Sequence, residues 1–523
     1  MKSKNKNKLI LFCFIGLLMI IAFAMRIVAC YWGDPQILNI DEQFIMLPAL
    51  DLIKNHTYIC HVVNRPDQVE IKCVALILSV ASKILWHADP NAIYDSHPIA
   101  LHVMGRFFTT CFGVAMIPVS VIFAGKMSDI LSINKIKTQI ITAFIFCFFP
   151  IYIQHSGYMT PDVPLACMVM LFCLFFIRHL EDGKVSSLII SAVIVGICTM
   201  IKWPGLFLCF GIALMVIYRS VKEKKYRNIF IHGIISVITV FLTCFIIMPN
   251  IISDFPVIMQ FMHEESKPRN VEGTRLSMFF QNFCFYFKTS VLNLGCISLI
   301  PFALGLFSLF KKRDRRSLVF MVGLLYWFII SIIPVQWIRW GTPIYLFYIL
   351  LVGVGISYGF EIINKKKVLK ICYVLVTGVL IINILLSGIC MTKYLSLPNV
   401  CYAGLNDLES MGINAGNSIS EWETPFCTWW GTTYYGEFDI DENGVATVKD
   451  PDSVPEYFVR SRTKPAEFYD AIDASFPLVY YIEPDGNYDQ KLMATSNIIY
   501  SIGYIFSKET RVGGWPVWVY KIK

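Results

Sequence analysis

Residues 9–30 read LILFCFIGLLMIIAFAMRIVAC, and this stretch decides the class of fold. About 20 consecutive apolar residues are enough for a helix to cross the hydrocarbon core of a bilayer. Lys2, Lys4, Lys6 and Lys8 precede the stretch, and no convincing small-residue cleavage site follows it. A secretory signal has a shorter apolar region. We therefore interpret residues 9–30 as a retained spanning helix with the amino terminus in the cytoplasm.

The composition of the whole chain agrees with this interpretation. Of 523 residues, 56% are hydrophobic and 15% aromatic, while 16% are charged. Soluble domains carry about 25% charged residues. The bilayer is therefore the solvent for most of the chain. We attribute the formal net charge of +8 to membrane orientation and expect no nucleic-acid partner.

Further apolar runs predict about eleven spanning helices in all. The ten runs after the first cover residues 98–125, 137–154, 162–180, 186–201, 204–218, 229–249, 289–310, 317–335, 342–360 and 368–391. The segment 69–87 is also apolar but contains Glu70, Lys72 and Lys83. That pattern favours an amphipathic helix lying on the membrane.

Basic residues orient the predicted helices. The loops RSVKEKKYR (219–227), KKRDRR (311–316) and KKKVLK (365–370) fall on one side and are rich in Lys and Arg. The loops on the other side contain fewer, which is the asymmetry expected of cytoplasmic and external loops. This assignment places residues 32–97 in the first outer loop.

The composition changes near residue 391, which divides the chain into a membrane domain (1–391) and a C-terminal domain (392–523). The second part alternates turn signals such as DENG and EPDG with apolar segments such as FPLVYYI (476–482) and PVWVYKI (516–522). We expect a small α/β domain that can fold by itself. An odd number of crossings places this domain outside the membrane, beside the first outer loop.

Ionisable residues gather at the outer ends of the predicted spans. They are Asp41, Glu42, Arg106, His155, Asp162, Lys202 and Arg339. Ionisable residues at membrane depth are costly and usually line a site or a pathway.

Each of these residues also has a structural interpretation. Asp41 and Asp162 can cap helices, and Lys202 can extend its ammonium group to the interface. His155 can be a structural histidine. Arg106 can form a structural ion pair with Asp162 or Glu42. It is their gathering on one side that favours a functional site.

The same residues carry a resemblance to a known family. An outer Asp-Glu pair after the first helix, an Arg in the next span, and TPDVP after FFPIYIQHSGY (148–158) resemble the membrane glycosyltransferases of fold type C. The sequence is most similar to the dolichyl-phosphate-mannose protein mannosyltransferase-like family 39, including bacterial relatives of the aminoarabinose transferase type. The likeness extends over about residues 8–391. The tail differs from the luminal insert of the eukaryotic members, which leaves the acceptor open.

The resemblance implies an inverting transfer of a sugar from a polyprenyl-phosphate donor to an acceptor hydroxyl on a protein, lipid or glycan. The family pattern assigns the general base to Asp41, with Glu42 orienting the acceptor or holding the base. The leaving phosphate needs fixed positive charge. The residues expected at the donor phosphate and sugar are Arg106, Asp162, Lys202, Arg339 and His155. A divalent metal assists some enzymes of this type, but no ligand cluster in the sequence requires one.

A transporter or flippase for a lipid-linked or anionic solute is the alternative function, because it too needs charged residues inside a bundle. Transporters often contain two related halves with sites near the midplane. This sequence has no visible repeat, and its charges lie near one surface, which favours the enzyme. Its richness in Lys, Asn and Ile is typical of AT-rich bacterial genomes, so we expect a multi-pass protein of the bacterial plasma membrane.

The topology gives a first prediction. In intact cells, a membrane-impermeant thiol reagent should label cysteines introduced within residues 400–523 and leave a cysteine introduced into loop 311–316 unlabelled. The loop cysteine should react after the membrane is permeabilised, which is the control. A tail that is labelled only after permeabilisation would contradict the predicted orientation.

Overall fold

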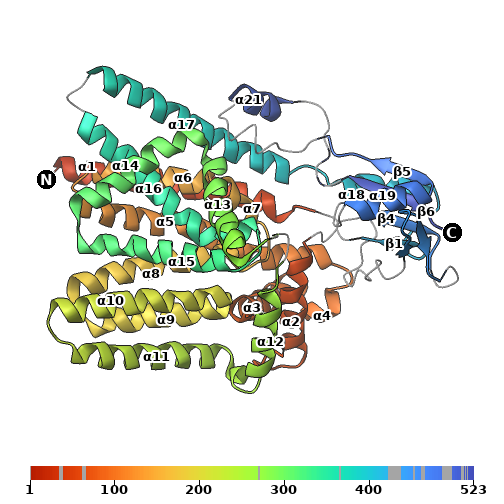
Figure 1. Cartoon of the computed structure of the whole chain (residues 1–523), viewed down its shortest axis with the longest axis horizontal. Coiled ribbons are helices and arrows are strands. Elements are labelled where there is room, and N and C mark those ends of the chain that lie inside the picture. Colours follow the sequence, from red (N-terminus) through yellow and green to blue (C-terminus); the bar gives the residue numbers. More distant parts are fainter. Residues whose placement is uncertain are drawn as a thin grey trace.

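The computed structural model describes residues 2–33, 39–61, 66–268, 271, 273–363, 367–421, 438–450, 454–460, 466–485, 498–507, 512, 514 and 516–523. The long helices run roughly side by side along one axis (Figure 1). Small sheets of the C-terminal part lie beyond one end of this bundle, the end where α2 and α4 are also found (Figure 1). The arrangement confirms a polytopic helical protein with a C-terminal α/β region.

The helical elements of the membrane part have the following bounds. They are α1 (Lys2–Cys30), η1 (Ile40–Glu42), α2 (Gln43–Lys54), α3 (Gln68–Leu85), α4 (Pro90–Ile93), α5 (Pro98–Leu131), α6 (Lys135–Phe148), α7 (Pro150–Ser156), α8 (Asp162–Asp182), α9 (Val185–Ile201), η2 (Trp203–Phe207), α10 (Leu208–Lys222), α11 (Arg227–Ile247), η3 (Pro249–Ile251), α12 (Phe255–Glu265), α13 (Arg275–Leu294), η4 (Cys296–Ser298), α14 (Leu299–Lys312), η5 (Arg315–Leu318), α15 (Val319–Ile332), η6 (Ile338–Gly341), α16 (Thr342–Ile363) and α17 (Lys367–Leu395).

Among the described residues, eight helices are long and apolar enough to cross a membrane, or up to ten if each of two bent pairs forms one span. The bent pairs are α6 with α7, at 52°, and α13 with α14, at 106°. The sequence predicts about eleven spans. If both bent pairs are counted as spans, the one predicted span that is missing is α9, which is apolar but only 17 residues long. The chain is thus a multi-pass membrane protein.

Each bend has a local cause in the sequence. Pro150 has no N–H to donate to the carbonyl of Phe146, so α6 cannot continue. Arg26 of α1 supplies the missing donors, through bonds to the carbonyls of Phe146 (3.1 Å) and Cys147 (3.2 Å). The second bend follows Gly295, whose φ of 89° is readily adopted only by glycine. Such breaks persist inside a bilayer when other groups satisfy the backbone.

Helices α14 and α16 pack closely because each has a glycine that faces the backbone of the other helix. A Cβ at Gly355 would overlap the Pro301 carbonyl oxygen, and one at Gly305 would overlap that of Leu351. Small residues allow this close approach between membrane helices.

Helices α2 and α3 form a separate small core at the end of the bundle. Its buried side chains include Ile45, Met46, Ile71 and Val74. On the opposite face of α3, Leu76, Val80 and Ile84 are exposed. The placement of this helix on the membrane surface stays a prediction.

The C-terminal part contains a four-stranded sheet in the order β1-β4-β6-β5. Strands β1 (Ser418–Ser420) and β4 (Tyr457–Arg460) are parallel. Strand β6 (Val517–Lys521) lies antiparallel to both β4 and β5 (Leu478–Ile482). The two apolar segments predicted as strands therefore pair with each other.

Further elements complete the C-terminal part. They are α18 (Val400–Ser410), the antiparallel pair β2 (Phe438–Ile440) and β3 (Ala446–Val448), α19 (Ala466–Ser475) and α21 (Ile498–Phe506). The predicted DENG turn joins β2 to β3, whereas the predicted EPDG turn (483–486) lies partly outside the described residues. Helix α21 packs against α17, where the Lys393 ammonium donates to the carbonyls of Tyr504, Ile505 and Ser507.

The α14–α16 contact gives a second prediction. Gly355→Ala should lower the melting temperature in detergent, because the added methyl group forces the two helices apart. Gly378→Ala in α17 is the matched control, since a Cβ there meets no atom within 4 Å. Its melting temperature should stay the same or rise, because alanine favours helix. Equal effects of the two substitutions would contradict the close contact.

Candidate active site

The two acids of the first outer loop point to different partners. Asp41 and Glu42 lie in η1, where the Asn39 side chain accepts a hydrogen bond from the Asp41 N–H (3.1 Å). The Glu42 carboxylate is fully buried and faces Arg106 of α5. The Asp41 carboxylate is 16% exposed and faces Arg339 of η6. Neighbouring residues thus make two separate ion pairs.

Glu42 and Arg106 form a bidentate pair. The Arg106 Nε and one terminal nitrogen donate to the two carboxylate oxygens of Glu42, each at 2.8 Å. The other terminal nitrogen donates to the carbonyls of Cys30 (2.6 Å) and Trp32 (3.0 Å) at the end of α1. The guanidinium is therefore occupied by protein groups. Two parallel bonds of this kind fix orientation as well as adding energy.

Glu42 accepts two more contacts. The Met159 N–H donates to it at 2.9 Å, and His102 Nδ1 lies 3.3 Å from it. The Glu42 carboxylate therefore joins η1 to α5 and to the loop before α8. Burial opposes its charge, but the charge of Arg106 and the hydrogen bonds from His102 and Arg106 prevail and lower the pKa of Glu42 to about 2.

The sign of this shift fixes its effect on stability. A pKa lowered from 4.5 means that the folded protein holds the ionised form more tightly than the unfolded chain does. The resulting stabilisation is fully present above about pH 4.5 and is lost as pH falls towards about 2.

The second ion pair joins Asp41 to Arg339 across the site. These side chains are 16% and 22% exposed, so the pair can be reached from outside the protein. The Arg339 guanidinium also lies 5.2 Å from the centre of the Trp337 ring. This pair is the accessible part of the polar cluster.

The third ion pair lies beside the second. Lys202, at the turn between α9 and η2, is 2.5 Å from Asp162 at the start of α8. Thr342 Oγ1 donates to the backbone carbonyls of both Asp162 and Arg339, each at 3.0 Å. Thr342 therefore brings the two ion pairs together at the same end of the bundle.

His155 of α7 completes the cluster. The charges of Asp162, Arg339 and Lys202 act on its ring, which also meets Tyr158 edge to face at 5.6 Å. In the described part of the chain, His155 Nδ1 and Asp162 Oδ2 are buried without a hydrogen-bond partner. Buried polar atoms without partners are costly and rare, so these two atoms are well placed to bind a ligand.

Two tryptophans belong to the cluster although the sequence reasoning did not select them. The Lys202 ammonium lies 5.1 Å from the centre of the Trp340 ring, and Trp337 lies beside Arg339. The rings of Trp337 and Trp340 meet nearly perpendicularly at 5.1 Å. The stretch QWIRWG (336–341) could have indicated these tryptophans, because one lies on each side of Arg339. The faces of the two tryptophan rings can bind the side-chain cations of Lys202 and Arg339, or can stack on a sugar ring.

The expected residues divide into two groups. Asp41, Arg339, Asp162, Lys202 and His155 form one polar cluster, of which the Asp41–Arg339 pair is the accessible part. Arg106 does not join them, because its guanidinium is buried against Glu42 and the end of α1. The structure therefore favours the ion-pair alternative for Arg106 over phosphate binding. The Glu42 carboxylate likewise faces Arg106 and not this polar cluster.

A metal site would need several ligand side chains close together. Across the residues that the structure describes, no three or more His, Cys, Asp or Glu side chains are grouped so that they could hold a metal ion.

The sequence and fold can be compared with known proteins. Residues 96–252 match the family model described as dolichyl-phosphate-mannose-protein mannosyltransferase. This segment contains Arg106, His155, Asp162 and Lys202. No curated protein matches the sequence.

Solved structures are also similar to this chain, among them those of two transferases. ArnT from Cupriavidus metallidurans bound to undecaprenyl phosphate is 14% identical, with a TM-score of 0.47 over 77% of this chain and 72% of its own. The archaeal oligosaccharyltransferase AglB from Archaeoglobus fulgidus, in complex with an inhibitory peptide and a dolichol-phosphate, is 10% identical. Its TM-score is 0.50 over 94% of this chain and 77% of its own. The AglB likeness shows the fold. The family match confirms the resemblance to the dolichyl-phosphate-mannose protein mannosyltransferase-like family.

The buried pair gives a third prediction. Arg106→Ala should lower the free energy of unfolding by about 3–5 kcal/mol, because Glu42 is left buried without its charge partner. The measurement is the thermal or denaturant stability of the purified protein in detergent. Arg178→Ala is the control, because its pair with Asp182 is exposed and should contribute little.

Glu42→Gln combined with Arg106→Met should be more stable than Arg106→Ala alone, since no buried charge remains. A normally stable Arg106→Ala protein would contradict the structural role of the pair.

Proposed function

We propose that this protein is a type-C membrane glycosyltransferase that moves a sugar from a polyprenyl-phosphate donor to an acceptor hydroxyl, with inversion at the anomeric carbon. The observation that carries the proposal is the accessible Asp41–Arg339 pair beside the Asp162–Lys202 pair, in which the Asp162 carboxylate is buried. A transfer of this kind needs a base on one side of the reacting carbon and fixed positive charge on the other. The cluster contains both.

Asp41 is the proposed general base. Its carboxylate takes the proton of the acceptor hydroxyl as the hydroxyl oxygen forms a bond to the anomeric carbon. The bond from that carbon to the phosphate oxygen breaks, and its electron pair stays on the lipid phosphate. A single displacement of this type inverts the anomeric configuration.

Arg339 and Lys202 are the proposed phosphate ligands. Both are held next to acids, and both lie against aromatic rings, so their charges are fixed in place. A donor phosphate that binds Arg339 competes with Asp41 for the guanidinium. Donor binding would thus weaken the Asp41–Arg339 pair and make the carboxylate a better base. Transfer chemistry would then follow donor binding.

Asp162 and His155 are proposed to position the donor. Asp162 Oδ1 accepts from Lys202, while its Oδ2 has no partner among the described residues and can accept a sugar hydroxyl. His155 Nδ1 is similarly placed to bond a sugar or phosphate oxygen. Both residues flank the break between α7 and α8, which allows a ligand to approach the backbone.

Glu42 and Arg106 are proposed to position the base. The Arg106 side chain fixes Glu42, and Asp41 is the residue before Glu42 in the same turn of η1. A bidentate pair holds the backbone of this turn against α5. The acids therefore have different tasks, with Asp41 reactive and Glu42 structural.

The site is proposed to face the extracytoplasmic side of a bacterial plasma membrane. The bias in Lys and Arg supports that orientation. The C-terminal part lies at the same end of the bundle, where Trp32 packs against its buried cluster of Val400, Cys401 and Val519. Since the Trp32 carbonyl accepts from Arg106, this domain stands close to the site and is suited to contact the acceptor, a protein, lipid or glycan.

Asp41→Asn tests the assignment of the base. Loss of a general base typically costs about 10²–10⁴-fold in rate. We expect a fall of that size in sugar transfer from synthetic polyprenyl-phosphate sugars, with the melting temperature little changed. Asp51→Asn is the matched control, because Asp51 is an exposed acid of α2 that bonds only locally to Asn55. Near-normal turnover by Asp41→Asn would exclude Asp41 as the base.

A further inference from the structure

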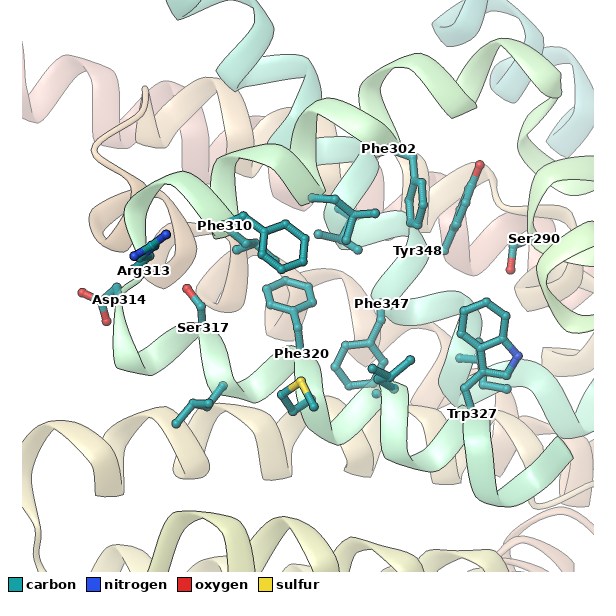
Figure 2. Close-up of a pocket in the computed structure, with 18 of the residues that line it drawn as sticks. Ser290, Phe302, Phe310, Arg313, Asp314, Ser317, Phe320, Trp327, Phe347 and Tyr348 are labelled. Atoms are coloured by element: carbon teal, nitrogen blue, oxygen red, sulfur yellow. The ribbon is translucent and has the colours of Figure 1, made fainter. Parts of the chain in front are cut away.

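An apolar groove begins at the loop 311–316, at the end of the bundle opposite the candidate site, and extends along the bundle as far as Ile344 in the first turn of α16. It has a volume of about 580 Å³ and runs between α14, α15 and α16. Figure 2 shows Phe310, Phe320 and Phe347 along it, with Arg313 at one end and Trp327 at the other. Ligand sites of this kind have volumes of about 300–1,000 Å³. The groove is therefore large enough for part of a lipid.

The groove opens towards the bilayer. Phe310 is 75% exposed, and Met321 and Leu324 are each more than 40% exposed. All three line the groove and belong to helices that are apolar along their length. A hydrocarbon chain can therefore enter from the side.

The end of the groove is positively charged. Arg313 and Arg315 line it, within the loop KKRDRR. Neither arginine forms an ion pair with another described residue. Asp314, which lies between them, is neutralised by Arg316, with bonds of 3.0 and 2.9 Å, and Arg316 also binds Glu181. The two lining arginines are thus available to an anion.

Contacts place this end far from the candidate site. Arg316 bonds to Glu181 near the end of α8, whereas Asp162 at the start of the same helix belongs to the candidate site. The 21 residues of α8 span roughly 30 Å, which is about the thickness of the hydrocarbon core. A lipid whose phosphate meets Arg313 therefore comes from the leaflet opposite the site.

We propose that this groove binds an anionic phospholipid of that leaflet, with an acyl chain along Phe310, Phe320 and Phe347 and the phosphate at Arg313 and Arg315. A polyprenyl-phosphate donor is a different ligand, because its phosphate would lie at the candidate site and not at Arg313 and Arg315. The proposal uses only the groove and its charges, so it stands apart from the proposed sugar transfer.

The test measures lipid binding to the delipidated full-length protein in detergent by native mass spectrometry. Phosphatidylglycerol should bind more tightly than phosphatidylcholine of the same chain length. The double variant Arg313→Gln, Arg315→Gln should bind phosphatidylglycerol roughly thirtyfold more weakly, at about 1 kcal/mol for each basic residue. The matched control is Lys311→Gln, Lys312→Gln, which removes two charges of the same loop that do not line the groove.

The acyl-chain part of the proposal has its own variant. Leu324→Trp fills the groove from its lipid-exposed side and should also weaken binding, with Arg313 and Arg315 intact. The proposal is overturned if the arginine variant keeps the preference for phosphatidylglycerol, or if the lysine control loses it equally. It is also overturned if Leu324→Trp has no effect, or if the arginine variant loses binding of polyprenyl phosphate instead.

Discussion

The buried pair of Glu42 and Arg106 is the constraint on which the rest of the site depends. Each partner alone would be a costly charge in an apolar interior, and the pair offsets that cost only through its two parallel bonds and the added carbonyl and N–H contacts. These contacts connect η1, α5, the end of α1 and the loop before α8. Once they form, the positions of Asp41 and the start of α8 follow.

The division between a buried and an accessible pair explains why two adjacent acids occur. Consecutive residues in a tight turn point in different directions, so one can hold the turn while the other faces a substrate. Glu42 is fully buried against Arg106 and His102, which keep it ionised. Asp41 pairs with a partly exposed arginine that an incoming phosphate can also bind. The proposed chemistry uses this difference.

The sequence predicted most spanning segments well, because lipid allows few backbone solutions to a long apolar run. The predicted span 289–310 was wrong, because the chain bends by 106° between α13 and α14 at Gly295. The sequence also placed the strands at 478–482 and 517–521 and the gathering of polar residues at one end. Hydropathy could not predict that Arg106 pairs with Glu42 and Arg339 with Asp41, since either arginine could match either acid. Packing decides that choice. Arg26 was missed for a similar reason, because its partners are carbonyls exposed by Pro150, far along the chain.

The two ends of the bundle present different surfaces. One end holds paired charges, aromatic rings and the C-terminal sheets, while the other holds the loop 311–316 and an apolar groove. This polarity suits the proposed reaction at one end and the proposed phospholipid site at the other.

The central claim is that the accessible pair performs the chemistry and the buried pair holds the structure. The most direct measurement is the single-turnover rate of sugar transfer by Arg339→Ala, with its melting temperature recorded in the presence and absence of donor. The account predicts near wild-type stability without donor, little stabilisation by donor, and a severe loss of rate. A variant that transfers sugar at the normal rate, or that is as unstable without donor as Arg106→Ala is expected to be, would contradict the account.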